Sequence, residues 1–128
     1  MPRRKKQSGR ISVFKGREVR LNRAIFYILA FKGPLTIYDI HKMVKTRRRL
    51  RHVRYASVNK RVRSLEELGY IKKIGAKKTK AGFEAYIYEL TARAYLAILL
   101  DSINLENLLM RVDETTASAI MAIITHVT

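Results

Sequence analysis

The sequence contains no cysteine among its 128 residues. A chain without cysteine forms no disulfide, builds no thiolate metal site and has no cysteine nucleophile. Histidine is also scarce, since His41, His52 and His126 are far apart and lack the spacing of a metal site. No glycine-rich phosphate loop occurs, and the six acidic residues of the basic part form no isolated pair in a cleft-like setting. We therefore expect neither catalysis nor a metal nor a cofactor.

Long uninterrupted apolar segments are missing as well. The most apolar region, residues 94–127, is interrupted by charged residues such as Asp101 and Arg111, well short of the ~20 consecutive apolar residues that span a bilayer. The basic start of the chain is not followed by the apolar core of a signal peptide. The expected protein is cytoplasmic and does not insert into a membrane.

Negative charge is the third scarcity. The chain has 27 lysines and arginines against 10 acidic residues, a formal net charge of +17. Residues 1–92 hold 25 of these bases and 6 acids, net +19, while residues 93–128 hold 2 bases and 4 acids, net −2. A concentrated basic surface gains affinity for a polyanion by releasing condensed counterions. This asymmetry favours a polyanionic partner over charge that only keeps the protein soluble.

The chain is long enough for one compact domain with an appendage. Residues 1–18 read as a basic arm, flexible at least as far as Gly9, that begins with Arg3, Arg4, Lys5 and Lys6. Its second half, from Ile11 to Phe14, could pair as a short strand or pack on the body. Such an arm can insert into a minor groove, or it can add nonspecific charge only, and the sequence leaves both roles open.

Three helices are predicted in the next segment. The first spans about residues 19–32, has an apolar stripe at helical spacing and ends at Gly33-Pro34. The second runs from a Thr36 N-cap to about Lys45. The third, closed by Gly69, buries a stripe formed by Val58, Val62, Leu65 and Leu68.

The exposed face of the third helix carries side chains that read base edges. Asparagine pairs bidentately with adenine, and arginine or lysine with guanine. The predicted base-reading residues are Ser57, Asn59, Lys60 and Arg63. An arginine run precedes this helix, and it is either a solvated loop or, as we expect from its position, a phosphate contact. The predicted backbone contacts are Arg47, Arg48, Arg49, Arg51, Arg54, Tyr55 and Arg61.

A β-hairpin is predicted after Gly69. Residues 70–74 and 85–90 are rich in isoleucine and tyrosine, and a tip bounded by Gly75 and Gly82 separates them. Lysines crowd this tip, where no core needs them. We expect the tip residues Lys77, Lys78, Thr79 and Lys80 to contact phosphates or the minor groove.

The C-terminal residues, 93–128, form apolar helices after a Thr91 cap. Their apolar stripes form more surface than a small three-helix body can cover. Such surface is usually buried against a partner subunit. The predicted dimer interface consists of Leu96, Leu99, Leu100, Ile103, Leu108, Leu109, Ile120 and Ile124.

Three segments together resemble the winged-helix transcriptional regulators of the PadR, MarR and ArsR kind. They are Ala56-Ser57-Val58, the turn Leu65-Glu66-Glu67-Leu68-Gly69-Tyr70-Ile71, and Tyr88-Glu89-Leu90-Thr91, and the likeness extends from about Leu21 to Asp101. It implies a mainly α fold with a small β-hairpin wing (α+β), that is, a winged helix-turn-helix with C-terminal dimerisation helices. The corresponding domains are an arm at 1–18, a DNA-binding domain at 19–92 and a dimerisation region at 93–128.

The chain departs from these families in three ways. It has no cysteine for ArsR-type metal sensing, its arginine run is longer than a turn requires, and its basic arm is extra. A cysteine-free composition rich in isoleucine, lysine and arginine is typical of thermophiles, and we expect an archaeal source.

The predicted function is sequence-selective binding of double-stranded DNA by a homodimeric transcriptional regulator, located on the nucleoid. Its third helix would enter the major groove and its wing would contact the backbone. The alternative is a nonspecific architectural or ribosome-associated nucleic-acid-binding protein, which would lose the difference between specific and nonspecific affinity as salt rises. An adaptor whose wing meets another protein remains a third possibility.

Overall fold

The computed structural model describes residues 11–127. Three helices come first, α1 (Val19–Lys32), α2 (Ile37–Val44) and α3 (Tyr55–Glu67). A hairpin of β1 (Ile71–Lys78) and β2 (Glu84–Leu90) follows, and then α4 (Ala92–Ser102), α5 (Leu105–Arg111) and α6 (Glu114–Val127). Two short 3₁₀ turns, η1 (Ser12–Phe14) and η2 (Arg48–Leu50), complete the described part. The predicted mainly α architecture with a β-hairpin is confirmed.

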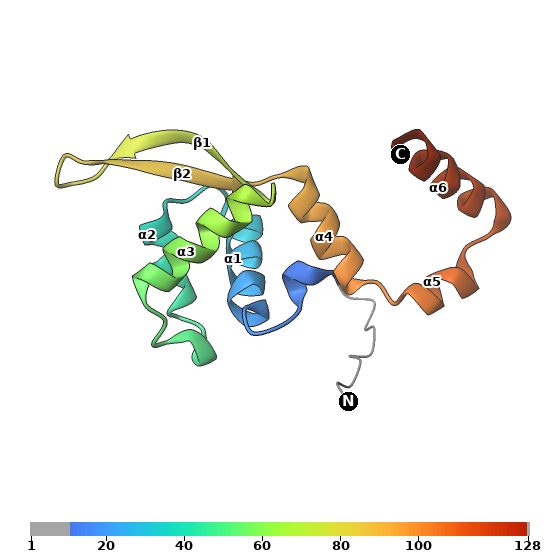
Figure 1. The fold of residues 1–128 in the computed structure, drawn as a ribbon, viewed down its shortest axis with the longest axis horizontal. Coiled ribbons are helices and arrows are strands. Elements are labelled where there is room, and N and C mark those ends of the chain that lie inside the picture. Colours follow the sequence, from blue (N-terminus) through green and yellow to red (C-terminus); the bar gives the residue numbers. More distant parts are fainter. Residues whose placement is uncertain (1–10, 128) are drawn as a thin grey trace, which may run out of the picture.

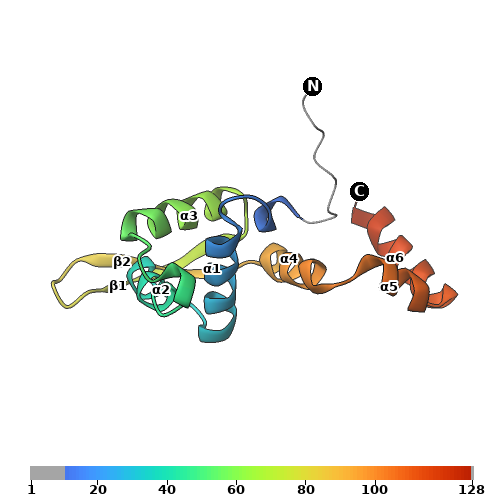
Figure 2. The same cartoon turned by 90° about the horizontal axis from the view of Figure 1, so that it is seen from below.

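The hairpin and the last two helices lie at opposite ends of the molecule (Figures 1 and 2). Helices α1, α2 and α3 pack together, and the antiparallel pair β1–β2 extends past them. Helix α4 lies beside this body, and α5 and α6 continue away from the hairpin. In the stretch from residue 11 to residue 127, no helix is both long and apolar enough to cross a membrane.

The core is formed by the apolar faces that the sequence periodicity predicts. Ile25 of α1, Ile40 of α2, and Val62 and Leu65 of α3 are all fully buried, and so is Phe26 of α1, which the predicted stripe did not include. Burying such a side chain contributes about 1.5–3 kcal/mol, so this cluster fixes how the three helices pack. A further pairing, not predicted, ties the hairpin to this body. Leu35 forms an isolated antiparallel bridge with Tyr88, and the two residues exchange hydrogen bonds of 3.0 and 2.9 Å.

Helix α3 ends one residue before the predicted stripe does. The amide of Tyr70 donates to the carbonyl of Leu65 and that of Gly69 to Glu66, which is the Schellman pattern, and Gly69 has φ +84°. The chain leaves the helix axis there, so Leu68 is 52% exposed. Its assignment to the buried stripe was therefore wrong.

The segment before α1 packs on the body instead of forming a strand. Val13 and Phe14 are buried, and the Phe14 ring contacts Phe26 edge-on at 5.3 Å between centroids. Asn22 of α1 is also buried; its Nδ2 donates to the Val13 carbonyl at 2.9 Å and its Oδ1 accepts from Arg61 Nε at 3.0 Å. One amide thus joins η1, α1 and α3.

The strands are longer than predicted, and the tip is shorter. Gly75 was predicted to bound the tip, but it lies inside β1, where the register shifts between Lys73 and Gly75. A glycine inside a strand pattern marks such a bulge as well as a turn, and the sequence did not distinguish the two. Lys77 and Lys78 consequently belong to β1 and pair with β2. The loop itself is closed by a 2.7 Å hydrogen bond from the Thr79 amide to the Phe83 carbonyl.

Helix α4 is held to the body by small residues and one ion pair. Thr91 caps it as predicted, accepting from the Ala94 amide. Ala94 and Ala97 are buried against the body, which leaves the leucines of this helix outside. Asp101 forms a 2.8 Å ion pair with Arg23 of α1, and the Asp101 side chain is 11% exposed.

Replacing Asn22 by alanine should destabilise the fold. Two groups lose their partner, the Val13 carbonyl and the Arg61 guanidinium, and such losses cost about 1–3 kcal/mol. Urea denaturation at one fixed protein concentration measures the effect. Asn107→Ala on the exposed surface of α5 is the control and should change stability by less than about 0.5 kcal/mol. Equal stability of the two variants would contradict this role of Asn22.

Candidate nucleic-acid interface

The outer face of α3 is polar and basic because the opposite face is used for the core. Ser57, Lys60 and Arg63 are exposed, and Asn59 is partly buried. No acidic residue lies on the first two turns of this helix, since Glu66 and Glu67 come at its end. The four residues predicted to read bases therefore lie on the outer side of one helix.

Asn59 and Arg63 contact each other in the free protein. Arg63 Nε donates to Asn59 Oδ1 at 3.3 Å across one helical turn. The amide oxygen has a second lone pair and the amide nitrogen has two donors, so Asn59 keeps the groups that an adenine edge requires. The contact places both side chains side by side on α3.

A cleft separates the first half of α3 from the hairpin. Its volume is about 280 Å³. The residues that line it come from α2, α3 and β2 and include Thr36, Tyr38, Tyr55, Asn59, Arg63, Glu84, Tyr86 and Tyr88. Burial raises the pKa of Tyr88, the negative charge of Glu66 raises it further, and the positive charge of Arg63 opposes both. The phenol therefore stays protonated at neutral pH and can donate a hydrogen bond at the base of the cleft.

The hairpin lysines have different surroundings. Lys73 Nζ lies 4.3 Å from the centroid of the Tyr86 ring and 3.9 Å from a Glu66 carboxylate oxygen. Lys77 Nζ lies 3.7 Å from Asp39 of α2. Lys78 and Lys80 are exposed and form no ion pair within residues 11–127. Of the predicted wing residues, Lys78 and Lys80 are thus the lysines free to meet an anion.

The arginine run belongs to an ordered turn between α2 and α3. His41 of α2 donates from Nε2 to the carbonyl of Val53 at 3.0 Å, and Leu50 of η2 packs half-buried against the core. The arginines of this turn point outward, and all five are exposed: Arg47, Arg48, Arg49, Arg51 and Arg54.

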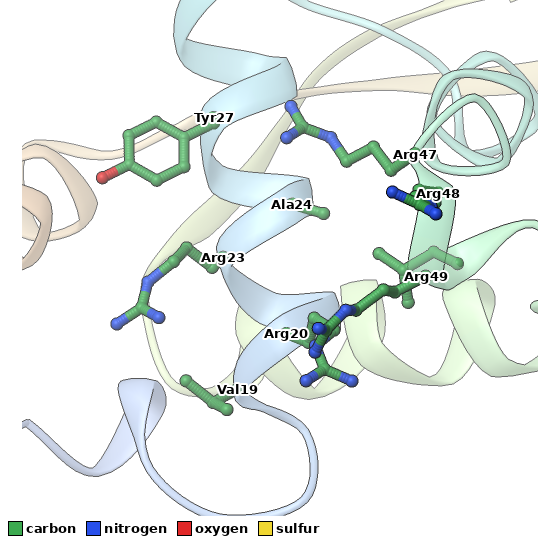
Figure 3. A pocket seen from close by; sticks show the side chains of 9 residues that line it. Val19, Arg20, Arg23, Ala24, Tyr27, Arg47, Arg48 and Arg49 are labelled. Atoms are coloured by element: carbon green, nitrogen blue, oxygen red, sulfur yellow. The ribbon is translucent and has the colours of Figure 1, made fainter.

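Three of these arginines share a groove with α1. Arg47, Arg48 and Arg49 line it together with Arg20 and Arg23, and its volume is about 580 Å³ (Figure 3). Sequence reasoning assigned no role to the two α1 arginines. The available signal was their spacing with Tyr27, since residues three or four apart share a helix face.

Arg61 has a partner inside the fold. Its Nε is engaged by Asn22, although a guanidinium has further donors, so the predicted backbone contact stays a prediction. Tyr55, also predicted to contact the backbone, is 45% exposed and touches His41 edge-on. The arm residues Arg3, Arg4, Lys5 and Lys6 lie outside the described residues.

The residues predicted for a dimer interface are largely exposed in this single chain. Leu96 and Leu99 are each 54% exposed on α4, Leu109 is 73% exposed on α5, and Ile124 is 48% exposed on α6. Leu100, Leu108 and Ile120 are exposed as well, and Ile103 is partly buried. Among the residues that the structure describes, no group of histidine and acidic side chains is placed to hold a metal ion.

Comparison with known proteins shows a likeness in fold. No protein-family model matches the sequence, and neither does any curated protein. The structure is similar to that of diamide-treated YodB from B. subtilis, with a TM-score of 0.51 and 18% sequence identity, over 70% of this chain and 76% of that chain. It is also similar to Bacillus subtilis PadR in complex with operator DNA, with a TM-score of 0.52 and 18% identity, over 77% of this chain and 62% of that chain. The chain therefore has the winged-helix fold of these proteins.

The titration of Tyr88 reports the arrangement of the cleft. Arg63→Gln should raise the pKa of Tyr88 further, because a positive charge that favours the phenolate is removed, and Glu66→Gln should lower it. Carbon NMR of the tyrosine rings measures both shifts, and Tyr88→Phe identifies the signal. Glu67→Gln, on the same turn, is the control and should leave the titration unchanged. Shifts of one sign in both charge variants would show that the cleft is arranged differently.

Proposed function

We propose that this chain binds double-stranded DNA with sequence preference, as a homodimeric transcriptional regulator. Helix α3 enters the major groove, and the hairpin contacts the phosphate backbone or the minor groove beside it. The observation that carries the proposal is the outer face of α3, where Ser57, Asn59, Lys60 and Arg63 lie together next to a basic hairpin.

The shape of this surface suits a duplex. An α-helix fits the major groove, which is about 12 Å wide, when its outer face is free of bulky apolar side chains. Short Ser57 allows close approach, while Asn59 and Arg63 carry the donors and acceptors that distinguish adenine and guanine. Lys78 and Lys80 extend beside the helix, where phosphates of the same duplex would lie.

Two further observations support a DNA-binding regulator. The net charge of +17 provides the counterion-release contribution that all duplex binding needs. PadR, which shares the fold, was solved in complex with operator DNA. The arm residues Arg3, Arg4, Lys5 and Lys6 are proposed to add backbone or minor-groove contacts.

The homodimer is proposed because of the C-terminal residues 93–128. Leucines and isoleucines of α4, α5 and α6 are exposed in one chain, and an apolar surface of this kind favours burial against a partner. Residues 93–128 carry net charge −2, so two copies of a +17 protein can meet there without strong repulsion. A two-fold dimer would set two α3 helices about 34 Å apart, one turn of duplex.

Base-reading and backbone contacts should separate in binding measurements. Asn59→Ala and Arg63→Ala should each cost about 1–3 kcal/mol on the preferred site and relax sequence preference, because the lost contacts are to bases. Lys78→Ala should weaken all sequences alike and reduce the salt slope by about one, because it removes one phosphate contact.

Binding-site selection from random duplex pools, followed by titrations at two salt concentrations, measures both effects. A preference that disappears as salt rises would favour the architectural alternative. Equal losses on selected and random duplex for all three variants would overturn the proposed division of roles.

Dimerisation should depend on the exposed stripe of α4. Leu99→Glu places a charge in the proposed interface and should shift sedimentation from dimer to monomer. It should also weaken duplex binding, although Leu99 lies on α4 and is not a proposed DNA contact. Leu68→Glu is a matched control, since Leu68 is 52% exposed and Leu99 54%, and it should remain dimeric. A wild-type protein that sediments as a monomer at micromolar concentration would show that the interface assignment is wrong.

A further inference from the structure

A second basic surface lies between α1 and the turn that joins α2 to α3. Arg20 of α1 and Arg47, Arg48 and Arg49 of the turn line one open groove of about 580 Å³. In Figure 3, Arg20 and Arg49 extend toward the same space, and Arg47 and Arg48 lie above Arg49 on the turn. All four side chains are exposed, so the groove is accessible to a ligand.

This groove faces away from α3. Asn22 marks the side of α1 that meets α3, because its Oδ1 accepts from Arg61 of that helix. At 100° per residue, Arg20 lies roughly 160° and Tyr27 roughly 140° around α1 from Asn22. Figure 3 accordingly shows α3 passing behind α1 when the groove is in front. Two helices, α1 and α3, each about 10 Å across, therefore lie between Arg20 and a duplex against the outer face of α3.

The arginines of the groove are not neutralised by the fold. Arg23, at the edge, is paired with Asp101 at 2.8 Å and contacts the Phe14 ring at 5.2 Å, so it has a structural role. Arg20, Arg47, Arg48 and Arg49 form no ion pair in the described part of the chain. Like charges this close raise the electrostatic energy of the free protein, and a bound anion lowers it. No contact in residues 11–127 explains why four such charges line one groove.

The chemistry of the groove selects phosphate carried on an extended molecule. Guanidinium groups bind phosphate oxygens with two parallel hydrogen bonds. A small ligand is usually held in a pocket that buries most of its surface, and these exposed side chains on an open groove do not enclose one. A second cavity adjoins the groove along α1, and both are lined by Tyr27 and Arg47. The rings of Tyr27 and Phe31 stack there with their centroids 6.1 Å apart, and Phe31 is 79% exposed. Aromatic rings beside arginines suit the sugars and bases of a nucleic-acid strand.

We propose that this groove binds the phosphodiester backbone of a second nucleic-acid segment, separate from the one that α3 contacts. The inference rests on the proposed function, since it adds a second surface to a DNA-binding protein. One protein molecule would then bridge two segments, one held by α3 and the hairpin and one held by the arginines of the groove. The predicted phosphate role of Arg47, Arg48 and Arg49 is retained, but for a different segment.

A bridging assay tests the proposal on the full-length protein. A duplex that contains the preferred site is fixed to beads and saturated with protein, and a labelled second segment is offered as duplex or as single strand. Binding of a soluble duplex is measured in parallel by fluorescence anisotropy. Wild-type protein should capture the second segment in at least one of its two forms.

Two charge-matched double variants locate the second surface. Arg20→Glu with Arg49→Glu changes the groove, and Lys42→Glu with Lys45→Glu makes the same change in net charge at exposed positions of α2 and its C-cap, outside the groove. Both should bind soluble duplex with affinities within about two-fold of each other. Capture of the second segment should fall about ten-fold or more in the groove variant relative to the control variant.

Four results would overturn the proposal. The groove variant could bridge as well as the control, or it could lose soluble-duplex binding in step with bridging, which would mean one continuous surface. Inorganic phosphate or ATP at matched ionic strength could release the second segment, which would assign the groove to a small phosphate ligand. If wild-type protein binds soluble duplex but captures no second segment, the bridging proposal fails alone. Failure to bind any duplex refutes the proposed function itself.

Discussion

The burial of one face of α3 against α1 and α2 is the interaction on which the rest of the molecule depends. Val58, Val62 and Leu65 are fully enclosed, and each contributes about 1.5–3 kcal/mol by leaving water. Because a helix has a fixed period, burying these positions forces Lys60 and Arg63 to the outside. The same packing directs the chain beyond Gly69 into the hairpin, so the polar face of α3 and residues of β2 come to lie on either side of a common cleft.

A small polar network supports this apolar contact. The Asn22 side chain of α1 accepts from Arg61 of α3 and donates to Val13 of η1, so it joins three separate segments. In the described part of the chain, no buried side-chain nitrogen or oxygen is left without a hydrogen-bond partner. An unpaired group there would cost more than a formed bond contributes, so the network specifies how α1 and α3 are oriented. That orientation in turn sets Arg20 on the far side of α1, away from the face of α3.

The charges divide the molecule into two parts. The body and hairpin carry nearly all of the basic residues, whereas residues 93–128 carry net charge −2 and present exposed apolar side chains. The proposed binding of a polyanion and the proposed association between copies therefore fall on separate surfaces, at opposite ends of the molecule (Figure 1). Helix α4 connects them, since Ala94 and Ala97 pack on the body while Leu96 and Leu99 remain outside. Arg23 and Asp101 hold this connection through an ion pair that is largely shielded from water.

The sequence by itself determined the helices, their caps and the inward faces of α1 to α3 except at Leu68, because these follow from local periodicity and from residues such as Thr36, Gly69 and Thr91. It also determined the polar face of α3, which is the complement of the buried stripe.

Only the tertiary structure decided what depends on contacts between distant segments. The bridge between Leu35 and Tyr88 joins residues whose pairing no local pattern specifies. The bulge at Gly75 depends on the register with β2, and local sequence describes a bulge and a turn equally well. The groove that brings Arg20 together with Arg47, Arg48 and Arg49 exists because helix packing places α1 beside the α2–α3 turn, although Arg20 is far from the other three in sequence. Side-chain direction on one helix is local, but which other helix it meets is set by the packing of the whole core.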